Sequence, residues 1–244
     1  MSRSDITLRR RDHELVRAAW SLGWVTCRVL TDVISPATSA KTLSGRLSQL
    51  AAAGFLRRRR IVGGPGGHLW LYGAGRNASA MDPAYAAAWR PPDFHLAHTI
   101  EVGDTLAALL TPDRLGSVAV TDWKGQAELR TWHCPGDAMA DLAIRWTCGA
   151  RVGSWLVEVD RGTESRHALR RKFLRYLHTP DREVLVVTTT DDRARNIATL
   201  ARELGVPVLT TDRRTFHMQT PPLVYDALFG RRRFVDEVLL GVQG

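Results

Sequence analysis

Apolar residues recur at helical spacing three times in the first third of the chain. The three predicted helices cover residues 12–20, 24–34 and about 39–53. In the third helix, Leu43, Leu47 and Leu50 fall on one side, so this helix is expected to bury a single apolar face. Gly54 follows directly, at the position where a glycine commonly ends a helix.

A β-hairpin is predicted next. Residues 55–62 read as a strand, residues 63–67 as a glycine-rich turn and residues 68–72 as the returning strand. Three helices followed by a hairpin resemble a winged helix-turn-helix domain. In such domains the third helix enters the major groove of DNA and the hairpin contacts the phosphates.

The excess positive charge of the chain lies in this first third. The whole chain has 34 Lys and Arg against 25 Asp and Glu, which gives a net charge of +9. Residues 1–77 hold 13 basic and 4 acidic residues, whereas residues 78–244 hold 21 of each kind. This asymmetry favours a module that binds double-stranded DNA, joined to a neutral module. The alternatives are a basic arm that only aids solubility and a winged helix that binds protein.

The winged-helix resemblance assigns DNA contacts to two groups of residues. On the third helix they are Lys41, Thr42, Ser44 and Arg46, and on the hairpin they are Arg57, Arg58, Arg59 and Arg60. The helix residues would meet base edges or phosphates, and the hairpin residues the DNA backbone. Because alternate residues of a strand point to opposite faces, only about half of the four hairpin arginines are able to touch DNA at once.

The rest of the chain predicts a linker and an α/β domain. Residues 78–93 are rich in Ala and Pro and form the linker, with a helical turn expected near Tyr85. In the domain, residues 94–244, helices are expected over residues 94–110, 165–178 and 192–204. Strands are expected over residues 117–120, 127–132, 137–144, 154–160, 182–190 and 206–210. This order predicts a mixed central sheet flanked by helices, so the whole chain falls in the α+β class.

Acidic residues mark the end of the strand over residues 154–160. Glu158 and Asp160 are two positions apart, so an extended backbone puts both side chains on one face. Asp137 lies upstream, and Lys172 lies on the next predicted helix. Carboxylates are the hard oxygen ligands that Mg²⁺ prefers, and an ammonium group can hold an attacking water or a phosphate. We therefore expect Asp137, Glu158 and Asp160 as Mg²⁺ ligands, and these three with Lys172 as the catalytic set of a phosphodiesterase.

Structural roles are the alternative for each of these residues. Asp137 follows a Pro-Gly pair, which is ordinary turn chemistry. Glu158 and Asp160 can instead pair with nearby arginines, which are Arg161, Arg166 and Arg170. Two like charges on one apolar face are costly without a cation between them, so we expect either a metal ion or an arginine partner. Lys172 can belong to a solvated basic face, because arginines flank it.

The order of elements and acids resembles the PD-(D/E)XK nuclease superfamily. Asp137 matches its first acid and Glu158 its second, and Glu101 matches an acid that many members place on their first helix. The chain departs from the pattern at Asp160, where the superfamily has a lysine. Some members carry that lysine on the following helix, where this chain has Lys172. The resemblance implies a restriction-endonuclease-like fold for residues 94–244.

A closer resemblance, to the plasmid replication-relaxation family, covers nearly the whole chain. It rests on the winged-helix region, the helix with His98, the Pro-Gly-Asp137-Ala run, the run from Glu158 to Glu164, and Lys172 with Tyr176. It implies a DNA-binding accessory protein of a plasmid or integrative mobile element, acting in replication, relaxation or mobilisation beside a relaxase or replication protein. The alternative is a Mg²⁺-dependent DNA endonuclease or nickase. A transcriptional regulator or antitoxin is a third hypothesis.

The sequence also predicts where the protein resides. No apolar run approaches the length of a membrane span, and the first residues lack the apolar core of a signal peptide. Three scattered cysteines, Cys27, Cys134 and Cys148, are typical of reduced thiols and not of a disulfide framework. We therefore expect a cytoplasmic protein without a membrane partner.

Overall fold

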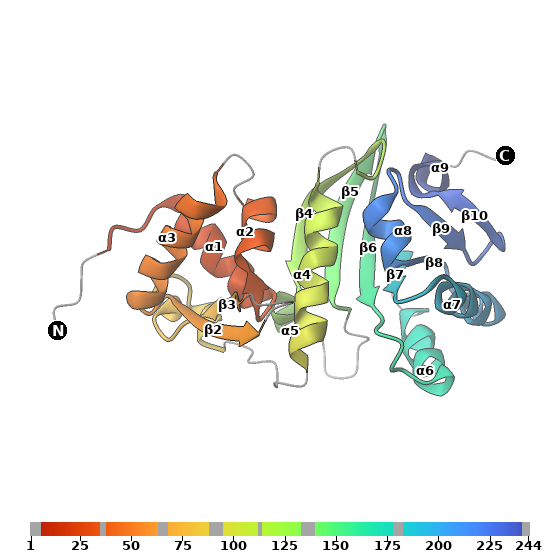
Figure 1. The fold of residues 1–244 in the computed structure, drawn as a ribbon. Helices are drawn as coiled ribbons and strands as arrows, with labels where there is room; N and C mark the ends of the chain where they lie inside the picture. Colours follow the sequence, from red (N-terminus) through yellow and green to blue (C-terminus); the bar gives the residue numbers. More distant parts are fainter. Residues whose placement is uncertain are drawn as a thin grey trace. The chain divides into compact units, whose positions relative to one another are not determined.

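The chain divides into two compact units. The computed structural model describes residues 6–34, 38–62, 68–87, 95–111, 114–132, 140–177 and 183–240. Unit 1 comprises residues 1–107 with 125–128, and unit 2 comprises residues 108–124 with 129–244. Figure 1 gives the labels of the helices and strands. Both units combine helices with a sheet, so the α+β class expected from the sequence is confirmed.

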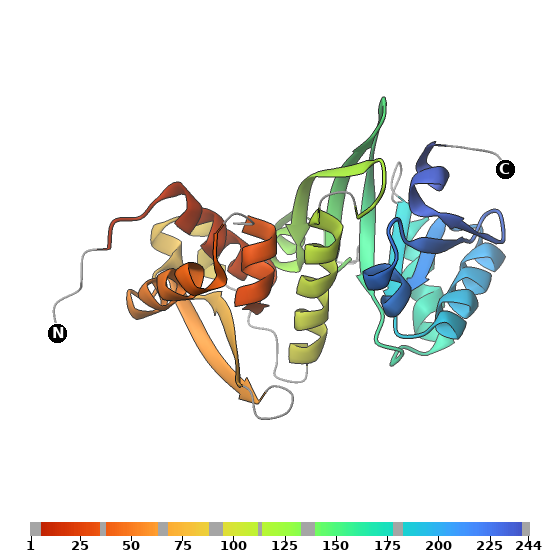
Figure 2. The same cartoon turned by 45° about the horizontal axis from the view of Figure 1, so that its top comes forward.

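Unit 1 is built from helices and a small antiparallel sheet. Its first elements are α1 (Arg10–Ser21), β1 (Val25–Thr26), α2 (Cys27–Ile34), α3 (Ala40–Ala52), β2 (Leu56–Val62) and β3 (His68–Ala74). The sheet has the order β1-β3-β2, and all its pairs are antiparallel. Figure 2 shows the β2–β3 hairpin extending away from the three helices. The short strand β1 was not expected, and the predicted turn over residues 63–67 lies outside the described residues.

The third helix follows its sequence pattern closely. Leu43, Leu47 and Leu50 are fully buried. The hydroxyl of Ser39 caps α3 by accepting a hydrogen bond from the backbone N–H of Thr42 at 3.3 Å. Gly54 has a φ of 79°, a backbone conformation that glycine reaches without steric cost. The helix therefore ends where the glycine predicted that it would.

A buried ion pair joins α1 to α3. The side chain of Arg46 donates to both carboxylate oxygens of the fully buried Asp12, at 2.9 and 2.6 Å. The backbone N–H of Arg9 donates to the same carboxylate at 2.7 Å. Burial alone would raise the pKa of Asp12, but these hydrogen bonds and the Arg46 charge hold it below its usual value. Arg46 is therefore engaged within the fold.

Unit 1 extends further along the chain than the sequence indicated. The turns η1 (Ala78–Ala80) and η2 (Pro83–Ala87) pack on it, because the Tyr85 ring lies 4.8 Å from the Trp20 ring. Most of α4 (Leu96–Leu110) also belongs to unit 1, and Arg28 of α2 donates to Asp104 at 2.5 Å. The expected linker is thus packed structure up to residue 87, and residues 88–94 lie outside the described residues. The expected boundary at residue 94 differs from this division because α4 packs on α2.

Unit 2 is organised around a seven-stranded mixed sheet. Its strands are β4 (Val118–Gly125), β5 (Leu142–Cys148), β6 (Arg151–Val159), β7 (Glu183–Thr188), β8 (Val208–Asp212), β9 (Leu223–Asp226) and β10 (Arg231–Phe234). The order is β10-β9-β8-β7-β6-β5-β4. Strands β6, β7 and β8 are parallel, whereas the pairs β5–β6, β8–β9 and β9–β10 are antiparallel. The carboxyl ends of β6, β7 and β8 therefore meet at one edge, which we call the parallel edge.

Two helices cover one face of the parallel strands. They are α6 (Arg166–Tyr176) and α7 (Asp191–Leu204). Their buried side chains pack against alternate strand residues, which are Leu156, Val184, Val186 and Val208. Since side chains alternate along a strand, Glu158 continues the face of Leu156 and points toward the same helices. Gly205, with a φ of 70°, ends α7 as the sequence predicted.

Three parts of the chain beyond residue 125 differ from the sequence-based expectation. The segment expected as a strand over residues 127–132 is the helix α5 (Gln126–Trp132). Ala127 and Leu129 are buried two positions apart, which mimics a strand over so short a run, but most of these residues are strong helix formers. The strand expected over residues 137–144 begins at Leu142. Beyond β8, the apolar pattern did not predict α8 (Arg213–Met218), β9, β10 or α9 (Val235–Leu240).

Two of the three cysteines lie among the described residues. Cys27 and Cys148 are free thiols, and burial raises the pKa of both. Cys134 lies outside the described residues. Among the residues that the structure describes, no helix has both the length and the apolar character needed to cross a membrane.

Asp12→Asn tests the ion pair between α1 and α3. At neutral pH the change leaves the Arg46 guanidinium without its charged partner, so the free energy of unfolding should fall by about 3 kcal/mol. Because the folded-state pKa of Asp12 is lowered, the contribution of the pair is present above about pH 4 and is lost as the pH falls through the folded-state pKa. The effect of the substitution should therefore shrink in acid, as urea unfolding at several pH values will measure.

Glu14→Gln is the matched control for this experiment. Glu14 pairs with the exposed Arg10 on the same helix at 3.2 Å, and exposed pairs of this kind contribute little to stability. Equal losses for Asp12→Asn and Glu14→Gln would contradict the role given to the buried pair.

Candidate functional site

The candidate site lies at the parallel edge of unit 2. Strand β6 ends at Val159, and the loop after it leads to Ser165, whose hydroxyl caps α6. Strand β7 ends at Thr188, and Thr190 caps α7 in the same way. These two strand-to-helix turns gather a set of polar residues that we call the edge cluster. Its members are Asp141, Glu158, Asp160, Glu164, Lys172, Tyr176, Thr188 and Arg193.

Glu158 is the buried centre of the edge cluster. It is only 4% exposed, and its carboxylate accepts hydrogen bonds from two residues of α6. The Lys172 ammonium donates to one oxygen at 2.8 Å, and the Tyr176 hydroxyl donates to the other. Lys172 also donates to Glu164 at 3.0 Å. The structure thus brings Glu158 and Lys172 together, while their catalytic role stays a prediction.

The electrostatics of Glu158 follow from its burial. Burial, with a smaller contribution from the neighbouring carboxylate of Asp141, raises the pKa of Glu158 to about 7 against the opposing charge of Lys172. Burial alone would lower the pKa of Lys172, but Glu158 and Glu164 hold it above its usual value. Burial and the Glu158 charge raise the pKa of Tyr176 well above its usual value. Tyr176 therefore stays a neutral hydrogen-bond donor. Glu158 gains or loses its proton near neutral pH.

Asp160 has a separate set of partners. Its carboxylate accepts from the Thr188 hydroxyl at 2.6 Å and from two nitrogens of Arg193 at 2.9 and 3.3 Å. Arg193 also donates to the backbone carbonyl of Glu164 at 2.7 Å, so it ties the loop after β6 to α7. Burial alone would raise the pKa of Asp160, but Arg193 and Thr188 hold it below its usual value. Arg193 of α7 is thus the arginine partner of Asp160, in place of the expected Arg161, Arg166 or Arg170.

Asp141 is the acid that sequence reasoning missed. It is 6% exposed and immediately precedes Leu142, which pairs with Val157 of β6, and its charge acts on Glu158. Its carboxylate accepts from the backbone N–H of Val159 at 2.8 Å. Asp137, which we had expected beside Glu158, lies outside the described residues. The available signal was the alternation of buried residues that begins at Leu142, which places Asp141 at the start of a strand.

Glu101, which matches a first-helix acid of the nuclease superfamily, belongs to unit 1. Glu101 and His98 both lie on α4, in the part that belongs to unit 1. The members of the edge cluster all belong to unit 2.

Side-chain cations compensate the two acids at the end of β6. Among the described residues there is no group of three or more His, Cys, Asp or Glu side chains able to hold a metal ion. The carboxylates of Glu158 and Asp160 are compensated by Lys172 and Arg193 instead. Mg²⁺ would have to displace these ammonium and guanidinium donors to reach the oxygens. Magnesium binding by Asp137, Glu158 and Asp160 stays a prediction.

In unit 1, the residues of α3 that we expect to contact DNA differ in exposure and in their hydrogen-bond partners. Lys41 and Thr42 are exposed at the start of α3. Ser44 is half-buried and hydrogen-bonds to Tyr72, whose pKa burial raises and this bond lowers. Arg46 is bound to Asp12. The exposed side of α3 also includes Gly45, where an added Cβ would meet no atom within 4 Å.

The four hairpin arginines alternate as the strand geometry predicts. Arg58 and Arg60 are exposed, whereas Arg57 and Arg59 are half-buried. The guanidinium of Arg57 lies over the Trp24 ring at 4.3 Å, and that of Arg58 lies over the Trp70 ring at 4.8 Å. Two of the four arginines are therefore presented to solvent on one face.

Glu158→Gln tests the buried carboxylate. Because the folded-state pKa of Glu158 is raised from 4.5 to about 7, folding takes up a proton between these pH values. The free energy of unfolding should therefore decrease as the pH rises through this range, by roughly 3 kcal/mol at most. Glu158→Gln should remove this decrease, as unfolding curves from pH 5 to pH 8 will measure. Glu203→Gln, at a largely exposed position, is the control, and an identical pH profile for wild type and Glu158→Gln would contradict the assignment.

Comparison with known proteins identifies the family. The family model described as Replication-relaxation matches residues 21–181, about two thirds of the chain. A search of curated proteins finds no match. Among solved structures, restriction endonuclease FokI bound to DNA matches with 9% identity and a TM-score of 0.23, over 96% of this chain and 45% of that one. This chain thus spans less than half of FokI, and so low a TM-score supports no argument about fold. On the family match, the chain belongs to the replication-relaxation family.

Proposed function

We propose that this protein is a DNA-binding accessory factor of a plasmid or integrative mobile element, acting in replication, relaxation or mobilisation. Unit 1 binds duplex DNA, and unit 2 serves assembly with a relaxase or replication protein. The observation that carries the proposal is the basic surface of unit 1, formed by the exposed start of α3 and by Arg58 and Arg60 of the hairpin. Its charge is complementary to the phosphate backbone.

The topology of unit 1 supports this assignment. The order α1-β1-α2-α3-β2-β3, with an antiparallel sheet and a projecting hairpin, is typical of a winged helix. In that arrangement α3 enters the major groove and the hairpin follows the phosphates. Gly45 lies in the middle of α3 with open space in front of it. A glycine there lets the helix backbone approach the base edges closely.

The DNA-contacting set is smaller than the sequence indicated. Lys41 and Thr42 contact the groove, and Arg58 and Arg60 contact the phosphates. Arg46 holds α3 in place through Asp12, and Arg57 lies over Trp24 within the fold. Their contribution to binding is therefore indirect, through the position of α3 and the hairpin.

Unit 2 is proposed to be non-catalytic. Each of the two acids at the end of β6 already has a cationic side-chain partner, so both are stabilised without a metal ion. The residue two positions after Glu158 is an acid, where the nuclease pattern has a lysine. An edge cluster that is complete in itself is suited to holding α6 and α7 on the sheet.

A metal-dependent endonuclease or nickase is the second candidate. The observation that favours it is the meeting of Asp141, Glu158 and Lys172 at one strand end, in the order acid, acid, lysine. Carboxylates and a lysine are the residue types that phosphodiester cleavage uses. This candidate requires Asp137 or another ligand to complete a metal site.

Arg58→Ala combined with Arg60→Ala tests the hairpin contact. Each lost phosphate contact removes about 0.9 from the slope of log affinity against log salt concentration, so the slope should flatten by up to about two. Affinity should fall about equally for all duplex sequences, because phosphates carry no sequence information. Fluorescence anisotropy with labelled duplexes at several salt concentrations measures both effects. The control pair, Arg170→Ala with Arg171→Ala, lies exposed on α6, and a slope that changes only in the control would refute the proposal.

Gly45→Ala tests the approach of α3 to the groove. The new Cβ meets open space in the free protein, and alanine is the better helix former. The free energy of unfolding should therefore rise by about 0.5–1 kcal/mol. The same Cβ would stand between the helix and the bases, so duplex affinity should fall. Serine at position 45 should act in the same direction. Higher stability with unchanged duplex affinity would show that α3 does not approach DNA at this point.

Plasmid nicking decides between the two candidates. The accessory-factor proposal predicts that supercoiled DNA is retarded in a gel but stays intact with Mg²⁺, Mn²⁺ or EDTA. Nicking that requires a divalent cation and disappears in Asp141→Asn and Glu158→Gln would establish the endonuclease. Nicking that persists in both variants would point to a contaminating nuclease and leave the accessory-factor proposal standing.

A further inference from the structure

The C-terminal hairpin of unit 2 carries exposed aromatic rings. Strands β9 and β10 are joined by a turn over residues 227–230. Phe229 is 61% exposed, Leu228 is 55% exposed and Phe234 is 40% exposed. Large apolar side chains gathered on so short a segment commonly mark a binding surface. The family match ends at residue 181, and the function proposed above does not use this hairpin.

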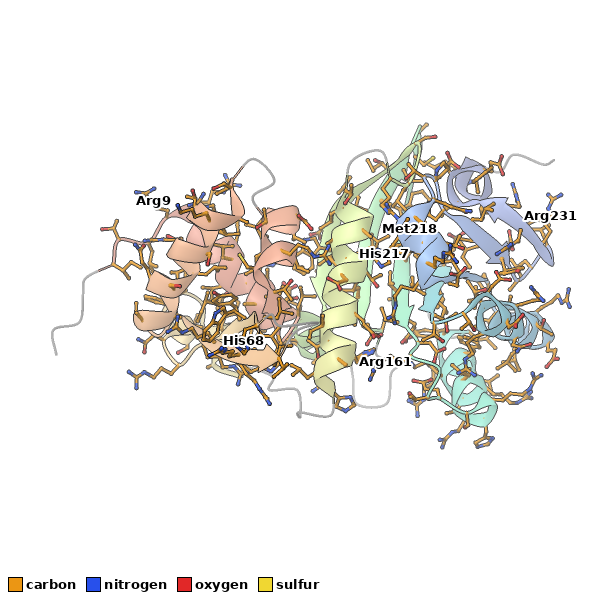
Figure 3. All side chains as sticks on the ribbon, in the orientation of Figure 1. Arg9, His68, Arg161, His217, Met218 and Arg231 are labelled. Carbon is orange, nitrogen blue, oxygen red and sulfur yellow. The ribbon has the colours of Figure 1, made fainter. Side chains whose placement is uncertain are left out.

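The segment from α8 to β10, which includes this hairpin, is strongly basic. Residues 213–234 hold five arginines and a single acid, Asp226, although residues 78–244 as a whole are neutral. Arg214, Arg231 and Arg232 are exposed, and Figure 3 shows Arg231 directed away from the strands. Arg233 is buried and donates to the backbone carbonyl of Glu237 at 3.0 Å, so it holds α9 in place. The exposed arginines favour a polyanion as the ligand.

The turn that presents Phe229 is fixed by the buried Asp226. The Asp226 carboxylate accepts from the backbone N–H groups of Leu228 and Phe229 at 3.0 and 3.3 Å. Its backbone carbonyl accepts from Gly230 at 2.8 Å. These bonds hold the backbone of the turn before a ligand arrives, which reduces the entropy lost on binding. The guanidinium groups of Arg231 and Arg233 each lie 5.8 Å from the centre of the Phe229 ring.

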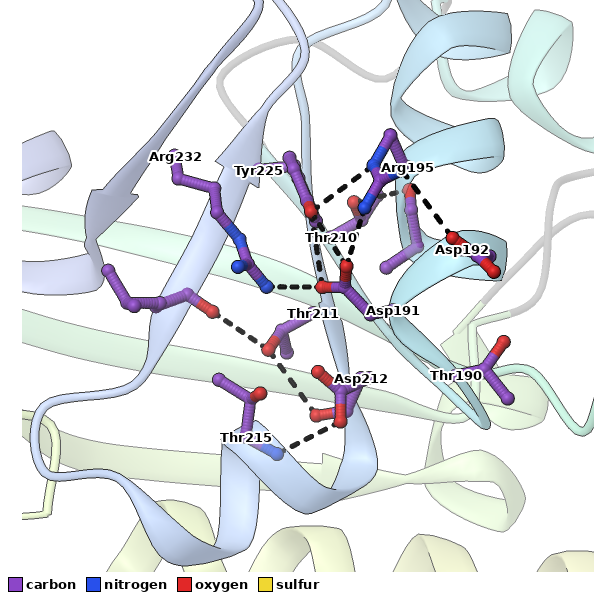
Figure 4. A network of polar contacts seen from close by, with 12 residues as sticks. Thr190, Asp191, Asp192, Arg195, Thr210, Thr211, Asp212, Thr215, Tyr225 and Arg232 are labelled. Carbon is purple, nitrogen blue, oxygen red and sulfur yellow. Dashed lines mark hydrogen bonds and ion pairs between the residues drawn. The ribbon is translucent and has the colours of Figure 1, made fainter.

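The strands behind the turn are held by a second network, drawn in Figure 4. The Asp191 carboxylate accepts from the Tyr225 hydroxyl at 3.0 Å, from Arg195 at 2.8 Å and from Arg232. The Arg232 guanidinium also lies over the Tyr225 ring at 4.6 Å. A pocket of about 450 Å³ beside this network is lined by Arg214, Arg232, Asp191 and Asp212, among others. The two arginines and two aspartates that line this pocket balance in charge, so it does not favour a polyanion. We therefore place the ligand on the hairpin surface.

From these observations we propose that the hairpin over residues 228–234 binds an unpaired nucleic-acid strand. Phe229 and Phe234 stack on bases, and the exposed Arg231 contacts the phosphates. Stacking is available to every base because each has a π face, so binding tolerates any sequence. A duplex hides these faces between neighbouring base pairs, so the hairpin discriminates against it. This surface is distinct from the duplex-binding surface of unit 1.

The test uses the full-length chain and two labelled probes, oligo(dT) and a duplex. Oligo(dT) binding is measured in excess unlabelled duplex, which occupies unit 1, and oligo(U) is compared with oligo(dT) to identify the preferred sugar. Phe229→Leu and Phe234→Leu should each weaken oligo(dT) binding roughly tenfold, because leucine keeps the apolar surface but removes the ring. Phe229→Tyr keeps a ring and should bind like wild type. Val152→Ala, at another exposed apolar position, is the control.

The two surfaces are separated by the pattern of losses. Hairpin variants should keep duplex affinity, and Arg58→Ala with Arg60→Ala should keep oligo(dT) affinity in the presence of duplex. The inference is overturned if oligo(dT) does not bind under these conditions, or if the leucine variants bind it like wild type. It is also overturned if Phe229→Tyr loses as much as Phe229→Leu, since the ring would then not be what binds. Unchanged melting temperatures of the variants ensure that each loss reports on binding.

Discussion

Unit 2 depends on the compensation of two carboxylates that its own sheet buries. Glu158 and Asp160 lie on the helix-covered face at the end of β6, each less than a tenth exposed. A buried charge without a partner would cost several kcal/mol. Lys172 of α6 and Arg193 of α7 are these partners. The two buried acids therefore require a cationic residue at one position on each helix. Glu164 links both cations, through its side chain to Lys172 and its backbone carbonyl to Arg193.

The same constraint acts in unit 1 and changes how the charge of the chain is interpreted. Asp12 is fully buried, and Arg46 compensates it across two helices. An arginine used in this way still counts toward the net charge of +9 but is not presented to DNA. Net charge therefore favours the proposed polyanion-binding role of unit 1, while burial and pairing determine which of its residues are available for that role. The proposed DNA-contacting set therefore keeps Lys41, Thr42, Arg58 and Arg60, which are exposed.

The sequence predicted elements better than it predicted partners. The repeating leucines of α3, the glycines that end α3 and α7, and the alternating hairpin arginines all appear as expected, because each depends on local geometry. The helix α5 was mistaken for a strand because six residues fit either period. Arg193 was missed because it lies 33 residues from Asp160, and only the parallel crossover brings them together. Asp141 was missed because the start of β5 was placed too early, and the hairpin of β9 and β10 has too few apolar residues to show a period.

In the proposed non-catalytic unit 2, side-chain cations and not a metal ion satisfy the acids at the end of β6. A ligand that binds only the folded state raises the free energy of unfolding, so Mg²⁺ binding at these acids would stabilise the protein. The most direct measurement is therefore the unfolding of wild type and Glu158→Gln in EDTA and in millimolar Mg²⁺. The account predicts that Mg²⁺ leaves the unfolding free energy of both proteins unchanged. A Mg²⁺-dependent stabilisation of wild type that Glu158→Gln abolishes would contradict it.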